Sequence, residues 1–306
     1  MAGFHSDRDP KKEEKNMKKL MIATLAGLCA AVTFGDLVSQ VVGYKNKNLR
    51  EGFTMAAPMF LNTTDASVVK LGDLTVTGYT AYDSAAFSGG TSGEVYLIVL
   101  DSLGRTKKDS QGNDMSYFYY DDLATDPVWG GQGAGWYTMG ATLKLDADKI
   151  TFDVGDALWI AGKNGYTVLC KGQVLSGNTN IPLQEGFTPC GNPYPVEIPL
   201  ANFAVTGYTA YDPATFSGGT SGEVYLIVLD SLGRTAKDEN GNDKSYFYYD
   251  DLATDTTWGG FGSGWYTMGA ASKLDAENTK FAAGEGLWVS GKPNYFLNLK
   301  SPVSFQ

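Results

Sequence analysis

The sequence predicts an all-β protein with two tandem β-sandwich domains, Greek-key or jelly-roll-like, that follow an N-terminal signal helix. Three observations lead to this prediction. The segment FSGGTSGEVYLIVLDSLGRT occurs twice without change, at residues 87–106 and 216–235. Glycine, tyrosine and phenylalanine are abundant, which favours turns and strands. Long helical periodicity is missing after about the first forty residues.

The centre of the repeated segment, EVYLIVLD, predicts a strand that is buried on both faces. Val95, Leu97 and Val99 would point to one side, and Tyr96, Ile98 and Leu100 to the other. Seven or eight strands are expected in each repeat, and glycine or Asx residues separate them. In the first repeat they are Val41–Tyr44, Phe53–Ala57, Leu74–Tyr82, Glu94–Leu100, Ser116–Tyr120, Trp136–Leu143, Ala157–Ala161 and Tyr166–Leu169. Asp146–Lys149 could form one helical turn.

The repeats extend well beyond the identical segment, because residues 78–166 match 207–295 without a gap. Repeated units of this kind fold as equivalent modules. We expect a first β-domain at 36–171 and a second at 172–306, with the boundary near Gly172. Four prolines between 189 and 199 stiffen the junction and keep it out of central strands.

Residues 1–35 are predicted to be a signal peptide with an N-terminal extension. Met17, Lys18 and Lys19 form a basic start, Leu20–Val32 is apolar but too short to span a membrane, and cleavage is expected before Asp36. Translation could start at Met1 or at Met17. Cys29 could mark a lipoprotein, although Leu28 precedes it where a small residue is usual. The mature chain is therefore expected to be exported and to have no membrane span.

Charge and histidine content exclude several functions. The full chain carries a net charge of −10, and removal of 1–35 leaves 18 of 24 basic and 30 of 34 acidic residues, a net charge of −12. Such a surface repels phosphate backbones, so nucleic acid is not an expected partner. The single histidine, His5, leaves with the signal. A mature chain without histidine cannot form a Ser-His-Asp triad, a Cys-His pair or a His-ligated zinc site.

Two cysteines remain after cleavage, Cys170 and Cys190. In an oxidising compartment an even pair favours a disulfide, which here would join the two repeats at their junction. A reactive thiol is the alternative, although no basic partner lies nearby in the sequence.

Short motifs around the repeats resemble a group of uncharacterised secreted bacterial proteins. The segments VVGYKNKNLREGFTMAAP and FDVGDALWIAGKNGY, with the lysine-rich signal, are similar to their "VGY…L.aGF" and "GeGfwv…G.V" β-repeats. The likeness covers most of the mature chain, but this sequence departs from the pattern at Met55–Pro58 and at the junction cysteines. The resemblance implies export to the periplasm or the extracellular space of a bacterium and duplicated β-domains, and it implies no activity or site residues.

Two acidic turns are candidate Ca²⁺ sites, at DSQGND and DENGND. Hard oxygen ligands spaced around a glycine suit this ion. The candidate ligands are Asp109, Asn113 and Asp114 in the first repeat and Asp238, Asn240, Asn242 and Asp243 in the second. A solvated hairpin turn is the alternative interpretation, since these residues are favoured in turns. No other cofactor is expected.

Trp129 and Trp258, each in a glycine-rich loop, are candidates for stacking on sugar rings. The alternative is that tryptophans of this region, among them Trp136, Trp159 and Trp288, fill the core. A carboxylate-based glycosidase is a third hypothesis. However, Asp121 and Asp122 are neighbours on a strand and would face opposite ways, and nothing in the sequence pairs Glu94 with a second acid.

The glycine run at 88–93 leads into a strand rather than a helix, so it lacks the features of a phosphate loop and is expected to be a flexible connection. The strand Tyr117–Tyr120 could be core, or it could lie at a sheet edge and pair with another chain. We expect a structural or interaction protein of the bacterial envelope or extracellular matrix, adhesin-like and without catalytic activity. Its expected partners are copies of itself, joined head-to-tail or through edge strands, or extracellular glycans.

Overall fold

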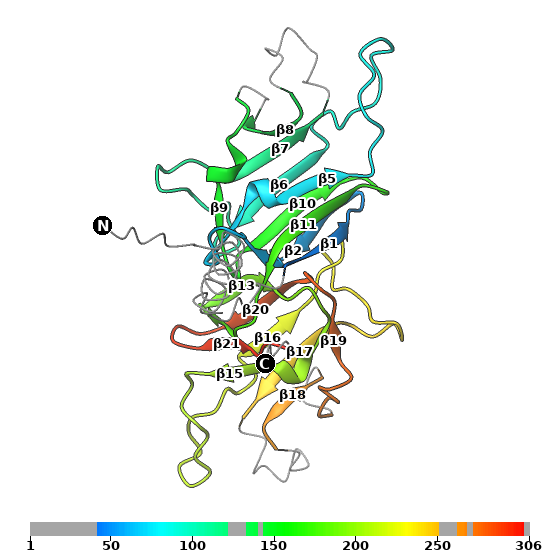
Figure 1. The fold of residues 1–306 in the computed structure, drawn as a ribbon. Helices are drawn as coiled ribbons and strands as arrows, with labels where there is room; N and C mark the ends of the chain where they lie inside the picture. Colours follow the sequence, from blue (N-terminus) through cyan, green and yellow to red (C-terminus); the bar gives the residue numbers. More distant parts are fainter. Residues whose placement is uncertain (1–41, 122–132, 140–142, 251–261, 268–271, 303–306) are drawn as a thin grey trace, which may run out of the picture. The chain divides into compact units, whose positions relative to one another are not determined.

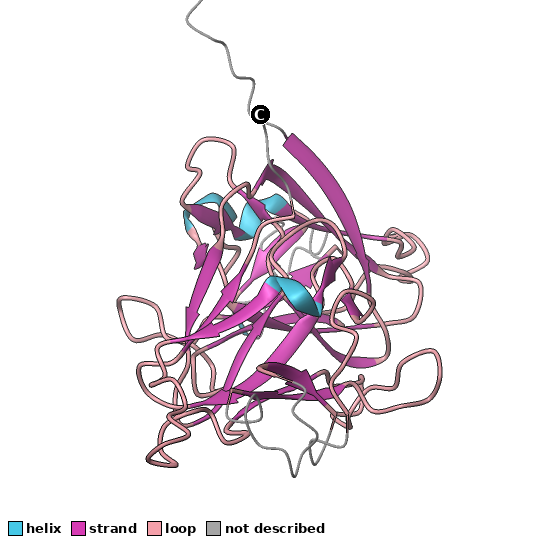
Figure 2. Cartoon of the chain, turned by 90° about the horizontal axis from the view of Figure 1, so that it is seen from below, coloured by secondary structure: helices cyan, strands magenta, loops and turns pink. Residues whose placement is uncertain are grey.

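A computed structural model describes residues 42–121, 133–139, 143–250, 262–267 and 272–302. These residues form antiparallel β-sheets joined by loops and short 3-10 turns, which confirms the predicted all-β, sandwich-like class (Figures 1 and 2). The 3-10 turns are η1 (Leu71–Asp73), η5 (Ala147–Lys149) and η6 (Leu200–Asn202). In the described part of the chain, no helix has the length and apolar character needed to cross a membrane.

The first repeat packs a four-stranded sheet against a five-stranded one. In the four-stranded sheet, β11 (Thr167–Val174) pairs with β1 (Val42–Asn48), β3 (Phe60–Leu61) and β5 (Leu74–Thr77). The five-stranded sheet has the order β2 (Gly52–Ala56), β10 (Ala157–Gly162), β6 (Val95–Leu100), β7 (Ser116–Tyr120) and β8 (Gly135–Tyr137). A small ribbon joins β4 (Val68–Lys70) to β9 (Thr151–Asp153).

The second repeat has the same arrangement with one strand fewer. Its three-stranded sheet has the order β12 (Thr179–Pro182), β21 (Phe296–Leu299) and β15 (Phe203–Thr206). Its five-stranded sheet has the order β13 (Gly186–Gly191), β20 (Gly286–Gly291), β16 (Val224–Ile227), β17 (Ser245–Tyr249) and β18 (Gly264–Tyr266). The ribbon is β14 (Ile198–Pro199) with β19 (Lys280–Phe281).

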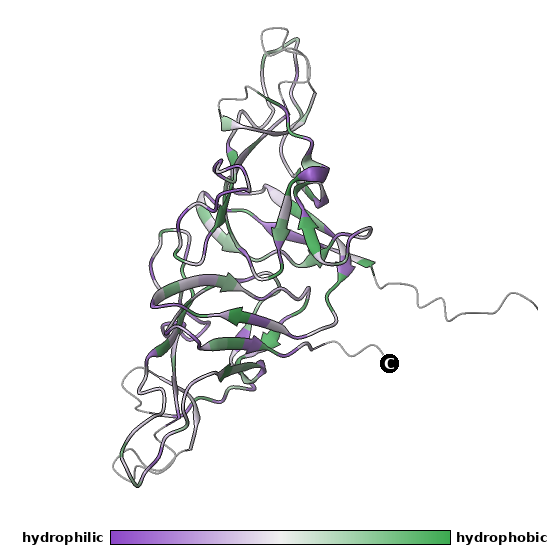
Figure 3. Ribbon diagram, turned by 90° about the vertical axis from the view of Figure 1, so that its left-hand side faces the viewer, coloured by the Kyte–Doolittle hydropathy of each residue, from purple (hydrophilic) through white to green (hydrophobic). Residues whose placement is uncertain are grey.

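Two separate hydrophobic cores lie inside the repeats, although residues 41–306 form one compact unit. The first contains Val95, Leu97 and Val99 of β6, and the second contains Val224 and Leu226 of β16. Several strands carry the hydrophobic colour in Figure 3. Strand β11 continues to Val174, past the expected boundary at residue 171, and stays in the first repeat's sheet.

Individual strands confirm or correct the sequence predictions. Strand β7 has the predicted bounds and lies between β6 and β8, so it is not the free edge that one hypothesis required. Strands β5 and β8 end earlier than predicted, and β3, β4 and β9 were not predicted. The prediction that the segment 94–100 is buried on both faces is wrong for part of its length. Tyr96 and Ile98 are only half-buried, because their face of the sheet points away from the core.

The predicted disulfide is absent, and both cysteines are free and buried. Cys170 lies on β11 in the first core, and Cys190 lies on β13 in the second. The two side chains therefore face different interiors, although they are close in sequence. Burial raises the pKa of each thiol to about 12. A buried, protonated thiol of this kind is not a nucleophile, so the reactive-thiol alternative is not supported.

We expect neither thiol to react with a water-soluble thiol reagent at neutral pH while the protein is folded. Under non-reducing denaturing conditions, Cys170 and Cys190 should both react, because each is then an exposed free thiol. Titration with a chromogenic disulfide reagent measures this. Two missing thiols after denaturation, restored by a reductant, would show that the bridge forms after all.

The free energy of unfolding should fall as the pH rises above about 9. The folded state holds the two thiol protons up to about pH 12, whereas an unfolded thiol loses its proton near the ordinary value of 9.0. Raising the pH through this window therefore favours the unfolded state. Urea unfolding at a series of alkaline pH values should show a shallower decline in the Cys170→Ala, Cys190→Ala variant. If the free energy of unfolding declines equally with pH in the variant and in wild type, the two thiols are not the cause of the decline.

Candidate functional site

The two repeats each expose one phenylalanine on a long loop. These phenylalanine loops, residues 79–93 and 208–222, connect β5 to β6 and β15 to β16. Phe87 and Phe216 have 83% and 82% of their surface exposed, the largest values among the exposed large hydrophobic residues of the described chain. Both also have a positive φ, 50° and 52°. An aromatic residue in this left-handed conformation costs about 1–2 kcal/mol relative to an ordinary one.

Hydrogen bonds hold the base and the tip of each loop. At the tip, Asp83 and Ser88 exchange backbone hydrogen bonds of 2.8 and 3.2 Å, and the Asp83 carboxylate accepts the N–H groups of Ala85 and Ala86. At the base, the buried Thr91 hydroxyl donates to the carbonyl of Tyr119 at 2.6 Å. The glycine run 88–93 is therefore an anchored loop rather than the flexible connection that the sequence predicted.

Asp121 fixes the loop to the sheet. Its Oδ2 accepts the Tyr82 N–H at 2.8 Å, and its Oδ1 accepts the Tyr79 hydroxyl at 3.2 Å. Burial, with contacts to Tyr119 and Asp121, raises the pKa of Tyr79 above its usual range, so this hydroxyl stays protonated and donates. Asp250 plays the same role toward Tyr208 and Tyr211 in the second repeat. Hydrogen bonds to the sheet thus hold the backbone of each loop around its phenylalanine.

A row of aromatic rings covers the outer face of both five-stranded sheets. In the first repeat Tyr96 stacks on Phe118 with ring centroids 4.3 Å apart, and Phe53 contacts Trp159 at 5.5 Å. The row continues into the second repeat, because Trp159 meets the equivalent Trp288 at 6.5 Å. The expectation that Trp159 and Trp288 fill the sandwich core is therefore wrong. They face outward and pack against each other where the repeats meet, with Met55, Leu100 and Ala157.

The repeats also contact each other through two reciprocal turns. The turn at 282–285 of the second repeat lies against strands β1 and β2 of the first. Lys47 Nζ donates to the Gly284 carbonyl at 3.0 Å, and the Ala57 N–H donates to the same oxygen at 3.2 Å. Met59 fills the remaining space, since a Cβ at Gly284 would lie 2.8 Å from its Sδ. Burial lowers the pKa of Lys47, against the attraction of Glu285.

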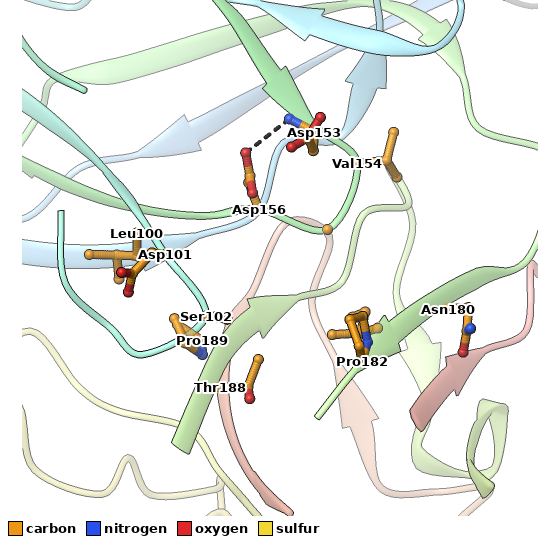
Figure 4. Close-up of a pocket in the computed structure, with 12 residues that line it drawn as sticks. Leu100, Asp101, Ser102, Asp153, Val154, Asp156, Asn180, Pro182, Thr188 and Pro189 are labelled. Atoms are coloured by element: carbon orange, nitrogen blue, oxygen red, sulfur yellow. Dashed lines mark hydrogen bonds between the residues drawn. The ribbon is translucent and has the colours of Figure 1, made fainter. Parts of the chain in front are cut away.

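The reciprocal contact leaves a cavity of about 240 Å³ (Figure 4). Here the turn at 153–156 and residues 100–102 of the first repeat face strands β12 and β13 of the second. The apolar part of the lining is Leu100, Val154, Ile181, Pro182 and Pro189, and the polar part is Asp101, Ser102, Asp153, Asp156, Asn180 and Thr188. Strand register explains the difference between the two contacts. Lys47 pairs with Val168 and Ile181 pairs with the equivalent Leu297, so Ile181 takes the place of Lys47 in the second repeat. In the same way Met55 pairs with Trp159 and Pro189 pairs with Trp288, so Pro189 takes the place of Met55.

Each turn carries a partly buried acid that pairs with a lysine, but the lysine comes from a different strand position in each repeat. Lys107 Nζ lies 2.8 Å from Asp156, and Lys244 Nζ lies 2.5 Å from the equivalent Glu285. The second repeat has Ala236 at the position of Lys107, and the first has Met115 at the position of Lys244. The two positions face each other, since Met115 N–H donates to Lys107 O and Lys244 N–H donates to Ala236 O. The lysine therefore lies on opposite sides of the hairpin in the two repeats, and each repeat keeps a pair between a lysine and an acid.

The candidate calcium residues lie in hairpin turns whose oxygens already accept hydrogen bonds. Asp109 Oδ2 accepts the side-chain amide of Asn113 at 3.1 Å, and its Oδ1 accepts the N–H groups of Asn113 and Gln111, each at 2.8 Å. The Asn113 side-chain bond, followed by the backbone bonds, holds the pKa of Asp109 below its usual range. Asp114 pairs with Lys108. In the second repeat Asp238 accepts from Asn240 and Asn242 in the same way, and Asp243 pairs with Lys237. Among the described residues, no group of three or more His, Cys, Asp or Glu side chains is placed to hold a metal.

The remaining predicted site residues are not brought together. Trp129, Trp258 and Asp122 lie outside the described residues. Trp136 is core, as the alternative interpretation expected, and its indole N–H donates to the Leu74 carbonyl at 3.0 Å. Glu94, just before β6, pairs with Lys163, and the Asp121 carboxylate accepts a hydrogen bond from the phenylalanine loop. Among the described residues, the carboxylates named for the glycosidase hypothesis, Glu94 and Asp121, thus lie in different places, and each already has its own partner.

Comparison of the chain with protein-family models, with curated proteins and with solved structures found no match. The class of protein is therefore defined by the fold and the site alone. It is an all-β protein in which two sandwich-like repeats carry equivalent anchored loops that differ in sequence at two positions.

Replacing Lys107 with Ala should lower the free energy of unfolding by about 1–3 kcal/mol, because Asp156 would lose its partner while largely buried. Adding Met115→Lys should restore most of this loss, since it installs the arrangement of the second repeat. Urea unfolding measures both variants. Lys108→Ala, which breaks an exposed pair with Asp114, is the control and should cost less than about 1 kcal/mol. A double variant no more stable than the single one would show that a lysine at position 115 cannot replace Lys107 as the partner of Asp156.

Proposed function

We propose that this chain is a secreted, adhesin-like interaction protein without catalytic activity, and that it grips partner surfaces through its two phenylalanine loops. The observation that carries the proposal is the strained and almost fully exposed phenylalanine that occurs in the same conformation in both repeats. An exposed aromatic ring stabilises the folded chain little, and its backbone conformation costs free energy. A residue with this balance is expected where a partner supplies the missing contact.

The anchoring of the loops supports the same function. Binding through a flexible loop loses conformational entropy, whereas a loop already held by Asp121 and Thr91 loses little. Two equivalent anchors on one compact unit also allow bivalent attachment, which strengthens binding without new contacts. The mature chain's negative charge favours partners that are neutral or basic rather than phosphate-rich.

The carbohydrate-binding alternative depends on Trp129 and Trp258, and it stays a prediction. In the described part of the aromatic row, Tyr96 and Phe118 stack face to face, so each covers a ring face that a sugar would need. A glycan array with wild type and a Trp129→Ala, Trp258→Ala variant tests this alternative. Binding that disappears in the variant would favour it over the phenylalanine loops.

The Phe87→Gly, Phe216→Gly variant should lose retention on envelope and matrix preparations of the source organism by at least about tenfold. Its free energy of unfolding should stay the same or rise by up to about 1 kcal/mol per loop, because glycine relieves the left-handed strain at some cost in chain entropy. Retention is measured by surface plasmon resonance on immobilised preparations, and stability by urea unfolding.

The matched control is Leu103→Ala with Leu232→Ala. These two leucines are also exposed, but neither has a positive φ. We expect the control to keep wild-type retention. Equal losses in the control and in the glycine variant would mean that general surface hydrophobicity, and not the loops, causes attachment.

A further inference from the structure

We propose that the partner of a phenylalanine loop is a second copy of this chain, and that the loop inserts Phe87 or Phe216 into the cavity between the two repeats. This inference rests on the proposed function and names the partner for the same loops. It brings together an apolar side chain that the fold leaves exposed and a cavity whose wall is partly apolar.

The closed contact at the turn 282–285 shows what kind of group fills such a space. On the other side of the repeat junction the chain fills the equivalent position with its own side chains, the methionines Met55 and Met59 and the stem of Lys47. In the open cavity Ile181 and Pro189 replace Lys47 and Met55, so the same turn meets shorter groups. An apolar side chain is therefore the occupant that the fold itself uses at this position.

The size and charge of the two parts are compatible. An engineered apolar cavity of about 150 Å³ holds benzene, and the present cavity of about 240 Å³ has room for a phenyl ring and part of its loop. The loop tip, residues 84–93, carries no charged side chain. The acids around the cavity are largely neutralised within the chain, since Asp101 pairs with Arg105 and Asp153 and Asp156 share Lys107. An uncharged tip therefore approaches without strong repulsion. The cavity is also continuous with the established contact between the repeats.

The resulting contact is heterologous, because a loop of one copy meets a different surface of the next. Such contacts build rings when the rotation between neighbouring copies closes, and open chains when it does not. Each chain offers two loops but, in its described part, one cavity of this kind. Either loop can therefore be lost without stopping growth, whereas blocking the cavity stops it.

Light scattering coupled to size exclusion, over a concentration series of the protein purified from an exporting host, tests the proposal. Wild type should show a mass that rises with concentration, and Phe87→Gly, Phe216→Gly should stay monomeric. Each single loop variant should still assemble. Ile181→Lys with Pro189→Met places in the cavity two of the three residues that close the contact at 282–285, and this cavity-blocked variant should also be monomeric. If the double substitution does not fold, as judged by urea unfolding, Ile181→Lys alone serves.

Mixing provides the sharpest measurement. The loop variant keeps its cavity and the cavity-blocked variant keeps both loops, so together they should form complexes of one cavity-blocked chain with up to two loop-variant chains, and nothing longer. A mixture that stays monomeric, or a cavity-blocked variant that still assembles, overturns the inference. Loss of surface retention without any effect on assembly would leave the proposed function in place and reject the second copy as the partner. Loss of neither would reject both.

Discussion

The apolar contact between Trp159 and Trp288 is the interaction on which the arrangement of the two repeats depends. Each sandwich buries its own core, so neither needs the other to hide its most apolar residues. What remains is the outer face of each five-stranded sheet, where aromatic side chains are only half-buried. Joining the faces at the two tryptophans, with Met55, Leu100 and Ala157 beside them, removes apolar surface from water that a single repeat would expose.

Near-identity of the repeats does not make their two contacts identical. The turn at 282–285 packs closely because Lys47, Met55 and Met59 reach it, whereas the turn at 153–156 meets Ile181 and Pro189 and leaves a cavity. A few substitutions at the edge strands thus convert a closed contact into an open one. The phenylalanine loops show the opposite behaviour, since the positive φ of the phenylalanine and the hydrogen bonds to Asp121 or Asp250 are the same in both copies, although the loop sequences differ at two positions. The proposed interactions use the open cavity and the duplicated loops.

Much of the fold could be predicted from local patterns. Alternation along β6 and the aromatic run of β7 predict strands because they act over a few residues, and the turn at η5 was expected for the same reason. Contacts between distant residues could not be predicted. Trp159 was expected in the core because nothing in its neighbourhood indicates that Trp288 covers it. Cys170 and Cys190 were expected to pair because an even number of cysteines in an exported chain favours a disulfide, but they belong to different sandwiches. Phe87 was overlooked since the glycines that follow it suggest a loose connection.

The exchange of lysines between the repeats has a consequence for how the gene can change. The two copies share a long identical stretch just before Lys107, so the amino-acid sequence can pass from one copy to the other there without a substitution. A crossover between positions 107 and 115 would join Lys107 to the lysine that stands at 244, or Ala236 to Met115. One hybrid would crowd two ammonium groups around a single carboxylate, and the other would bury an acid with none. A hybrid of the two copies across this hairpin is therefore expected to be less stable than either copy.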